Sequence, residues 1–230
     1  MNPLSLPLVA VQGLWVRATT ERLPEASGPY SGVAGNGSGA AVRVGVLGES
    51  TAAGCGVGSY EDGFTACLAR ELAERTGRPV EWEVAGRNSV TVGEVRDELL
   101  PRLGDGLDAA VLLAGVNDVL HRSSPRKWED DLSAVLDGLG QRAGRVVMTG
   151  VPPFRAFPSL PGALRGYLAE RADALDAVSR RVCAGRPTVT WVDSGGIVPA
   201  GPEFFARDRF HPSAEGYRRW AQAVAELLAS

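Results

Sequence analysis

The sequence has few of the residues that build metal centres and disulfide frameworks. Its 230 residues include only three cysteines and two histidines. The cysteines, Cys55, Cys67 and Cys183, are odd in number and lack the short spacings of metal ligands. We therefore expect reduced, mostly buried thiols in a cytoplasmic protein.

The chain also lacks a strong excess of charge of either sign. Its formal net charge is −3, which gives no reason to expect nucleic acid or an anionic membrane surface as a partner. At 44% hydrophobic residues, a chain of this length suits one α/β domain with a substantial core.

No apolar run is long enough to span a bilayer. The longest candidate, Leu4 to Val16, is similar to the core of a signal peptide. However, no Lys or Arg precedes it, Pro7 and Gly13 interrupt it, and no small-residue cleavage site clearly follows. We expect a leader that packs on the domain. Membrane association or export through residues 4–16 is the alternative.

Residues 22–40 are rich in Gly, Pro, Ser and Asn and are typical of a linker. We therefore expect two parts, a leader arm and linker over residues 1–40 and one domain over residues 41–230. Internal repeats and other low-complexity tracts are absent.

Within the expected domain, short apolar runs alternate with amphipathic stretches. Strands are expected at Val42–Leu47, Val80–Ala85, Leu107–Ala114, Arg145–Thr149 and Val189–Val192. Helices are expected at Phe64–Arg75, Val90–Leu100, Trp128–Leu139, Leu164–Cys183 and Ser213–Leu228, the last with His211 or Ser213 as N-cap. Such alternation predicts a five-stranded parallel sheet with helices on both faces, and ligands bind such sheets at the carboxyl ends of the strands.

Polar residues follow three of these strands. Ser50 comes directly after the first strand and Gly48, where its hydroxyl can face a substrate and its N–H a developing oxyanion. Asn117 follows the third strand and can donate its amide N–H, and the loop Gly86 to Thr91 after the second strand can add a backbone N–H. Alternatively, Ser50 is the N-cap of the next helix and Asn117 belongs to an Asx turn.

Asp208 and His211 lie three residues apart near the end of the chain. A carboxylate at that spacing can hold one imidazole tautomer while the other ring nitrogen faces a substrate. The order along the chain is therefore nucleophile, two donors and base, all brought to one edge of a parallel sheet.

In three blocks, Gly48-Glu49-Ser50, Gly115-Val116-Asn117-Asp118 and Asp208-Arg209-Phe210-His211, the chain resembles the SGNH (GDSL-type) hydrolases. The resemblance runs over residues 42 to about 226. It implies a three-layer α/β/α fold with a five-stranded parallel sheet, and hydrolysis of an ester or thioester through an acyl-enzyme. By position, Ser50 would be the nucleophile, His211 the base and Asp208 its orienting carboxylate. Asn117 and the Ser50 N–H would join the oxyanion hole.

Two positions depart from the family pattern. Glu49 stands where the family usually has Asp, and we expect altered activity rather than its loss. Ser89 occupies the place of an oxyanion-hole glycine, and Gly86, three residues earlier, is the alternative donor. A serine there would be strained if the position needs a positive φ.

The remaining candidates are weaker. Phe154 and Phe157 follow the fourth strand and either wall an apolar acyl pocket or belong to a rigid surface loop. His121 is expected to be a solvated loop residue, and Asp118 a turn former rather than a second catalytic acid.

The sequence thus predicts a serine hydrolase of a small acyl ester or thioester, with no metal or organic cofactor. The same acyl-enzyme would also serve an acyltransferase or a ring-forming release enzyme. A catalytically inactive domain that binds an acylated ligand is the alternative from another class.

Overall fold

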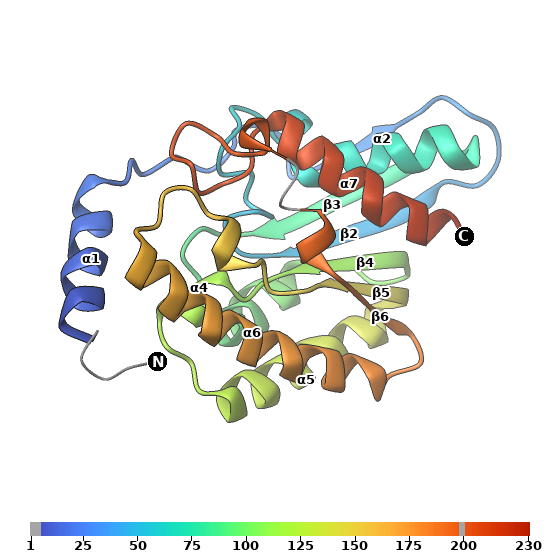
Figure 1. Cartoon of the computed structure of the whole chain (residues 1–230). Coiled ribbons are helices and arrows are strands. Elements are labelled where there is room, and N and C mark those ends of the chain that lie inside the picture. Colours follow the sequence, from blue (N-terminus) through green and yellow to red (C-terminus); the bar gives the residue numbers. More distant parts are fainter. Residues whose placement is uncertain (1–5, 198–200) are drawn as a thin grey trace.

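The computed structural model describes residues 6–197 and 201–230 and contains one mixed β-sheet. Its strands lie in the order β1-β3-β2-β4-β5-β6 (Figure 1). Their bounds are β1 Ser31–Ala34, β2 Val42–Gly48, β3 Val80–Gly86, β4 Leu107–Leu113, β5 Ala143–Thr149 and β6 Val189–Val192. Strands β2 to β6 are parallel to one another. The five predicted parallel strands are confirmed, with ends shifted by at most two residues.

The sheet has six strands rather than five, because Ser31–Ala34 pairs antiparallel with β3. We expected these residues to be part of a linker, and that expectation is wrong for this segment. A Cβ on Gly32 would lie 2.8 Å from the Trp82 ring, so a glycine is needed for β1 to pass over this side chain. Composition alone does not reveal such a strand, because half of its residues are exposed and it carries no apolar alternation. The division of the chain at residue 40 stays a prediction.

Helices cover both faces of the sheet. The α-helices are α1 Leu6–Thr19, α2 Phe64–Thr76, α3 Val92–Glu94, α4 Val116–Leu120, α5 Pro125–Arg142, α6 Gly162–Ala184 and α7 Ala214–Ala229. Figure 1 shows α2 and α7 together on one side, and α5 and α6 on the other. The three-layer α/β/α arrangement is therefore confirmed.

Two predicted helices differ in detail from the structure. The segment expected to be helical over Val90–Leu100 begins with a capping box between Thr91 and Glu94 and continues as a π-helical turn over Val95–Leu99. The last helix begins after Ser213, whose Oγ accepts a hydrogen bond from Gly216 N at 3.1 Å. Ser213 is thus the N-cap, and His211 stays outside the helix.

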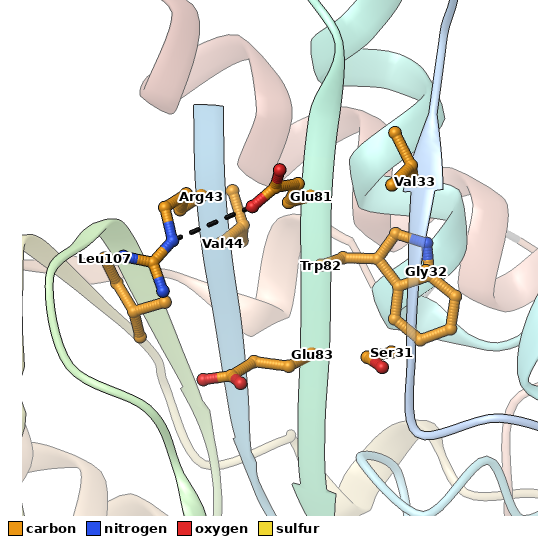
Figure 2. Close-up of a pocket in the computed structure, with 9 residues that line it drawn as sticks. All are labelled: Ser31, Gly32, Val33, Arg43, Val44, Glu81, Trp82, Glu83 and Leu107. Carbon is orange, nitrogen blue, oxygen red and sulfur yellow. Dashed lines mark ion pairs between the residues drawn. The ribbon is translucent and has the colours of Figure 1, made fainter. Parts of the chain in front are cut away.

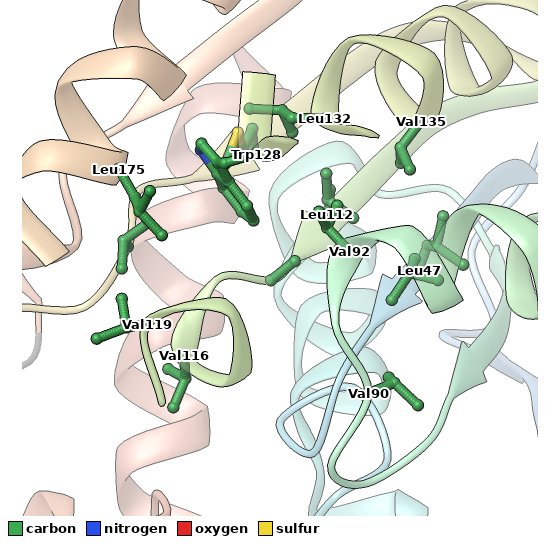
Figure 3. Close-up of a cluster of buried hydrophobic side chains, with 14 of the residues drawn as sticks. Leu47, Val90, Val92, Leu112, Val116, Val119, Trp128, Leu132, Val135 and Leu175 are labelled. Carbon is green, nitrogen blue, oxygen red and sulfur yellow. The ribbon is translucent and has the colours of Figure 1, made fainter. Parts of the chain in front are cut away.

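The position of β4 between two layers of helices explains why its sequence is almost free of polar residues. Val111 and Leu113 belong to the core cluster with α2 and α7, whereas Ala110 and Leu112 belong to the cluster with α5 and α6. Because helices cover both faces, both sets of side chains are buried. In the second cluster, Trp128 is fully buried among aliphatic side chains (Figure 3), and its indole N–H donates to Ser179 Oγ at 3.1 Å.

The predicted leader forms helix α1, which packs against α6. Gln12 Oε1 accepts a hydrogen bond from Leu164 N at 2.8 Å, and Val9 is buried. Residues 4 and 5 of the apolar stretch lie outside the described residues. Among those that the structure describes, none of the helices is both long and apolar enough to cross a membrane.

Candidate active site

The three predicted site loops follow three neighbouring strands. Strand β2 lies between β3 and β4, so the loops that begin after Gly48, Gly86 and Leu113 leave the same edge of the sheet side by side. This places the backbone of Ser50 between the loop of Ser89 and that of Asn117. The strand order therefore brings together the elements that the sequence analysis singled out.

Ser50 lies in the turn directly after β2 and is almost completely buried. It is not a helix N-cap, because the next helical turn begins at Tyr60 and α2 is capped by Gly63. The glycine before the turn is also explained. A Cβ on Gly48 would lie 2.1 Å from the carbonyl oxygen of Leu113, so only glycine allows this close approach of β2 to β4.

Asp208 and His211 form the expected pair. Asp208 Oδ2 lies 2.6 Å from His211 Nδ1, and Asp208 Oδ1 accepts hydrogen bonds from the backbone N–H groups of Phe210 and His211, both at 3.0 Å. Burial raises the pKa of the Asp208 carboxyl, but the hydrogen bonds from His211 and Phe210 together outweigh it, and the pKa lies below its ordinary value. The carboxylate is therefore held ionised and fixes the ring, with Nε2 left for a substrate.

Two contacts fasten this pair to the Ser50 turn. A Cβ on Gly56 would lie 2.1 Å from the carbonyl oxygen of Pro212, so the two segments touch directly. The Tyr217 hydroxyl, which is fully buried, donates to the carbonyl oxygen of Cys55 at 2.7 Å. Residues more than 150 positions apart are thus held together at the same edge of the sheet.

Glu49 has contacts that the sequence could not show. Its buried carboxylate accepts three hydrogen bonds, from Val116 N at 2.9 Å, from Asn117 N at 3.0 Å and from Asn117 Nδ2 at 2.6 Å. Burial raises the pKa of Glu49 to about 7, against the lowering effect of these donors. The longer carboxylate is accommodated because it reaches the loop after β4, and it fixes one N–H of the Asn117 amide while the other stays available.

Asn117 lies in the first turn of α4, not in an Asx turn. The helix begins after Gly115, whose φ of 122° a residue with a side chain rarely adopts. Asp118 accepts hydrogen bonds from Val92 N and Ser123 Oγ, both at 2.8 Å, and so ties two loops together as a structural residue. His121 is exposed at the end of α4, as expected for a solvated residue.

Ser89 has a φ of 63°, in the left-handed region that favours glycine. The strain anticipated for a serine at this position is therefore present. Gly86 is needed for a different reason, because a Cβ there would lie 2.5 Å from Ala53 N in the Ser50 turn. Of the two, Ser89 has the backbone conformation of a turn beyond the strand, and Gly86 is still within the β3 pairing opposite Gly48.

Phe154 and Phe157 are buried and stack on each other with ring centroids 5.0 Å apart. Phe157 in turn contacts Phe205 and Phe210, and Phe210 meets the His211 ring edge-on at 5.2 Å. The two predicted phenylalanines therefore back an aromatic wall, and the half-buried Phe205 and Phe210 form its outer layer. Phe205 and Phe210 were not among the predicted site residues, although Phe210 lies within the Asp208–His211 motif and Phe205 lies three residues before it.

Two cavities lie away from these residues. The first, of about 280 Å³, lies over the amino-terminal halves of β2 and β4 and over β1 and β3 (Figure 2), with an Arg43–Glu81 ion pair of 3.8 Å at its rim. The second, of about 180 Å³, lies between Ser123 and α6. Within the described ranges, no three His, Cys, Asp or Glu side chains are grouped so that they could hold a metal ion.

Known proteins share both the sequence pattern and the fold. The GDSL-like esterase Rv1075c of Mycobacterium tuberculosis is 29% identical over 192 residues, which are 76% of this chain and 58% of that protein. The chain thus spans little more than half the length of this relative.

Solved structures agree with the fold. A lipase/acylhydrolase from Enterococcus faecalis matches with a TM-score of 0.63 and 20% identity, over 82% of this chain and 95% of that one. The structure of TesA matches with a TM-score of 0.64 and 21% identity, over 81% and 97% of the two chains. The model of the GDSL-like lipase/acylhydrolase family matches residues 46–219, a range that includes Ser50, Asn117 and His211. The chain belongs to the GDSL-like lipase/acylhydrolase family.

Proposed function

We propose that this protein is a serine hydrolase that cleaves a carboxylic ester or thioester through an acyl-enzyme on Ser50. The observation that carries the proposal is the Asp208–His211 pair, with its 2.6 Å contact, fastened through Pro212 and Tyr217 to the turn of Ser50. A nucleophile, a base and an orienting carboxylate that share one edge of a sheet are the groups that acyl transfer needs. Family membership and the names of the relatives support the same reaction class.

In the proposed mechanism, His211 Nε2 takes the proton of the Ser50 hydroxyl as its oxygen attacks the acyl carbonyl. Asp208 stays ionised and stabilises the imidazolium that forms. His211 then gives the proton to the leaving alcohol or thiol, which departs and leaves an ester on Ser50. Water, activated by His211, attacks this ester, which releases the carboxylic acid and regenerates free Ser50.

The proposed oxyanion hole consists of the backbone N–H groups of Ser50 and Ser89 and the side-chain amide of Asn117. Preorganised donors are effective because they need no reorientation as charge develops on the carbonyl oxygen. The hydrogen bond from Asn117 to the buried Glu49 carboxylate supports this assignment, since it restrains the amide in one orientation. The left-handed backbone at Ser89 supports its place in the hole over that of Gly86.

An apolar acyl group fits the aromatic wall beside His211 better than a polar one. Phe154 and Phe157 would support the acyl pocket from behind, and Phe205 and Phe210 would face the chain. Turnover of esters with acyl chains of increasing length tests this part. A rate that falls steadily from acetate upward would contradict it.

The activity itself is tested with a chromogenic ester and two matched variants. Ser50→Ala is expected to abolish turnover above background, whereas Thr51→Ala removes the neighbouring hydroxyl and should retain it. Full activity in Ser50→Ala would overturn the mechanism. Product analysis with and without an added alcohol distinguishes hydrolysis from transfer to a second substrate, because both proceed from the same acyl-enzyme.

A further inference from the structure

Helix α1 carries an unusual share of the exposed apolar surface. Nine large hydrophobic side chains of the described residues are exposed, and five of them belong to this one helix. The five are Leu6, Leu8, Val11, Leu14 and Trp15, with exposed fractions between 49% and 70%. A concentration of this kind marks a surface for an interaction partner or a membrane rather than ordinary solvent-facing residues.

The orientation of α1 is fixed by its other side. Val9 is buried, Val16 packs on the core, and Gln12 is hydrogen-bonded to the first turn of α6. At 100° per residue, Val11 and Leu14 project from the opposite side, and Leu8 and Trp15 lie next to them on one flank of the helix. A helix that is apolar on both sides is normally covered on both, and here the protein covers only one.

The exposed face of α1, defined by Leu8, Val11, Leu14 and Trp15, lies at the catalytic edge of the molecule. In Figure 1, α1 stands beyond the carboxyl ends of the strands, next to the start of α6. Its buried residues join the same core cluster as Phe154 and Phe157, which back the aromatic wall beside His211. A surface that covers this face therefore lies at the same end of the sheet as the proposed active site.

The charges around α1 favour an anionic partner. No Asp or Glu occurs in the first 20 residues, and the next acid in the sequence, Glu21, is paired with Arg207 at 2.9 Å. Arg17 and Arg22 follow the exposed face, Arg165 lies in the first turn of α6, and Arg209 lies in the turn of the catalytic pair. Within the described part of the chain, these four arginines have no carboxylate partner.

We propose that the exposed face of α1 docks on an anionic lipid surface. A helix of 14 residues, about 21 Å long, is too short to span a bilayer but suited to lie in its interface. Trp15 and the arginine rim are residues that interfaces and anionic headgroups favour. A symmetric pairing with a second copy would instead bring the same arginines together, and like charges oppose it.

Docking does not depend on Ser50, so its test is independent of the proposed activity. The full chain carrying Ser50→Ala is sedimented with vesicles of phosphatidylcholine alone and with vesicles containing phosphatidylglycerol. We expect binding to the anionic vesicles that weakens as salt is raised. Changing Val11 and Leu14 to Glu should weaken this binding by roughly tenfold or more.

The matched control changes Val33 and Leu227 to Glu. These side chains are also exposed, at 65% and 36%, but lie on β1 and α7, and the control should bind vesicles like the parent chain. Circular dichroism verifies that both double variants fold. Equal binding by the two double variants, or no binding by the parent, would overturn the proposal. A lipid-free parent that is dimeric by light scattering, with only the α1 variant monomeric, would assign the face to a second copy instead.

Discussion

Replacing Glu49 by Gln should slow the chemical step without weakening substrate binding. The carboxylate accepts hydrogen bonds from three N–H groups, including the side-chain amide of Asn117, whose Nδ2 lies 2.6 Å from Glu49 Oε2. A glutamine of the same shape has one carbonyl oxygen and an NH₂ group, so either Val116 N or both Asn117 donors face the NH₂ group. The Asn117 amide then either loses its acceptor or keeps only an uncharged one, and it is held less firmly for the oxyanion.

The size of the effect follows from the hydrogen bond that is lost. A hydrogen bond to a charged group contributes about 1.5–3 kcal/mol, which corresponds to a factor of about 10 to 150 in rate. The loss of one oxyanion donor costs about 10²- to 10³-fold and sets the upper limit. We therefore expect kcat to fall about 10- to 100-fold for Glu49→Gln, with KM nearly unchanged.

A double-mutant cycle tests the cause. If Glu49 acts through Asn117, Glu49→Gln should add little to the loss that Asn117→Ala already causes. Asp118→Asn serves as the matched control, since it makes the same exchange at a buried carboxylate bonded to Val92 and Ser123 instead. Asp118→Asn should lower the free energy of unfolding, and it should lower kcat less than Glu49→Gln does. Equal effects of Glu49→Gln with and without the Asn117 amide would refute the reasoning.

Three further results are expected. Ser89→Gly should raise the free energy of unfolding, measured by urea denaturation, by up to about 1 kcal/mol, because glycine adopts a φ of 63° without strain. The kcat should stay within about twofold of the parent value. A lower free energy of unfolding would show that the serine side chain stabilises the fold by more than its backbone strain costs. Since the pKa of Glu49 is raised from 4.5 to about 7, the folded chain holds the extra proton between these values. Stability from this group is therefore full below pH 4.5 and declines by about 3 kcal/mol as pH rises through 7, a slope that urea midpoints should show for the parent and not for Glu49→Gln. Asp208→Asn should reduce kcat by about 10⁴-fold, as expected when a triad loses its orienting carboxylate; an esterase assay showing less than a tenfold loss would remove Asp208 from the mechanism.

The position of the candidate site could be predicted from the sequence because it depends on where the parallel strands end. Ser50 follows a run rich in Val and Asn117 a run with almost no polar residue, and both are recognisable as buried strands. The carboxyl ends of parallel strands form one edge. The Asp208–His211 contact is local, since three residues separate the partners, and so it too could be read from spacing.

The features that could not be predicted depend on contacts between distant segments. Strand β1 is defined by its pairing with β3 and by the Trp82 ring that Gly32 admits, and its own residues carry no strand pattern. The role of Glu49 depends on the loop after β4, which is 67 positions away in sequence. The effect of the one additional methylene of Glu49, relative to Asp, cannot be judged until the donors that its carboxylate reaches are known.

The local distribution of charge likewise could not be predicted from the net charge. A net charge of −3 gave no indication of an anionic surface as partner. In the described part of the chain, arginines without a carboxylate partner nevertheless lie in α1, shortly after it and in the first turn of α6. Many acids elsewhere are neutralised in ion pairs, such as Asp131 with Arg96 and Lys127. Net charge therefore describes the whole chain and not the edge that carries the proposed chemistry.

The central claim is that Ser50 is the nucleophile, and a fluorophosphonate that labels activated serines tests it most directly. Peptide mapping by mass spectrometry should find one label per chain, on Ser50. Labelling should disappear in Ser50→Ala, stay in Thr51→Ala and slow in Asn117→Ala and Glu49→Gln. A folded parent chain that is not labelled, or a label on another residue, would contradict the account.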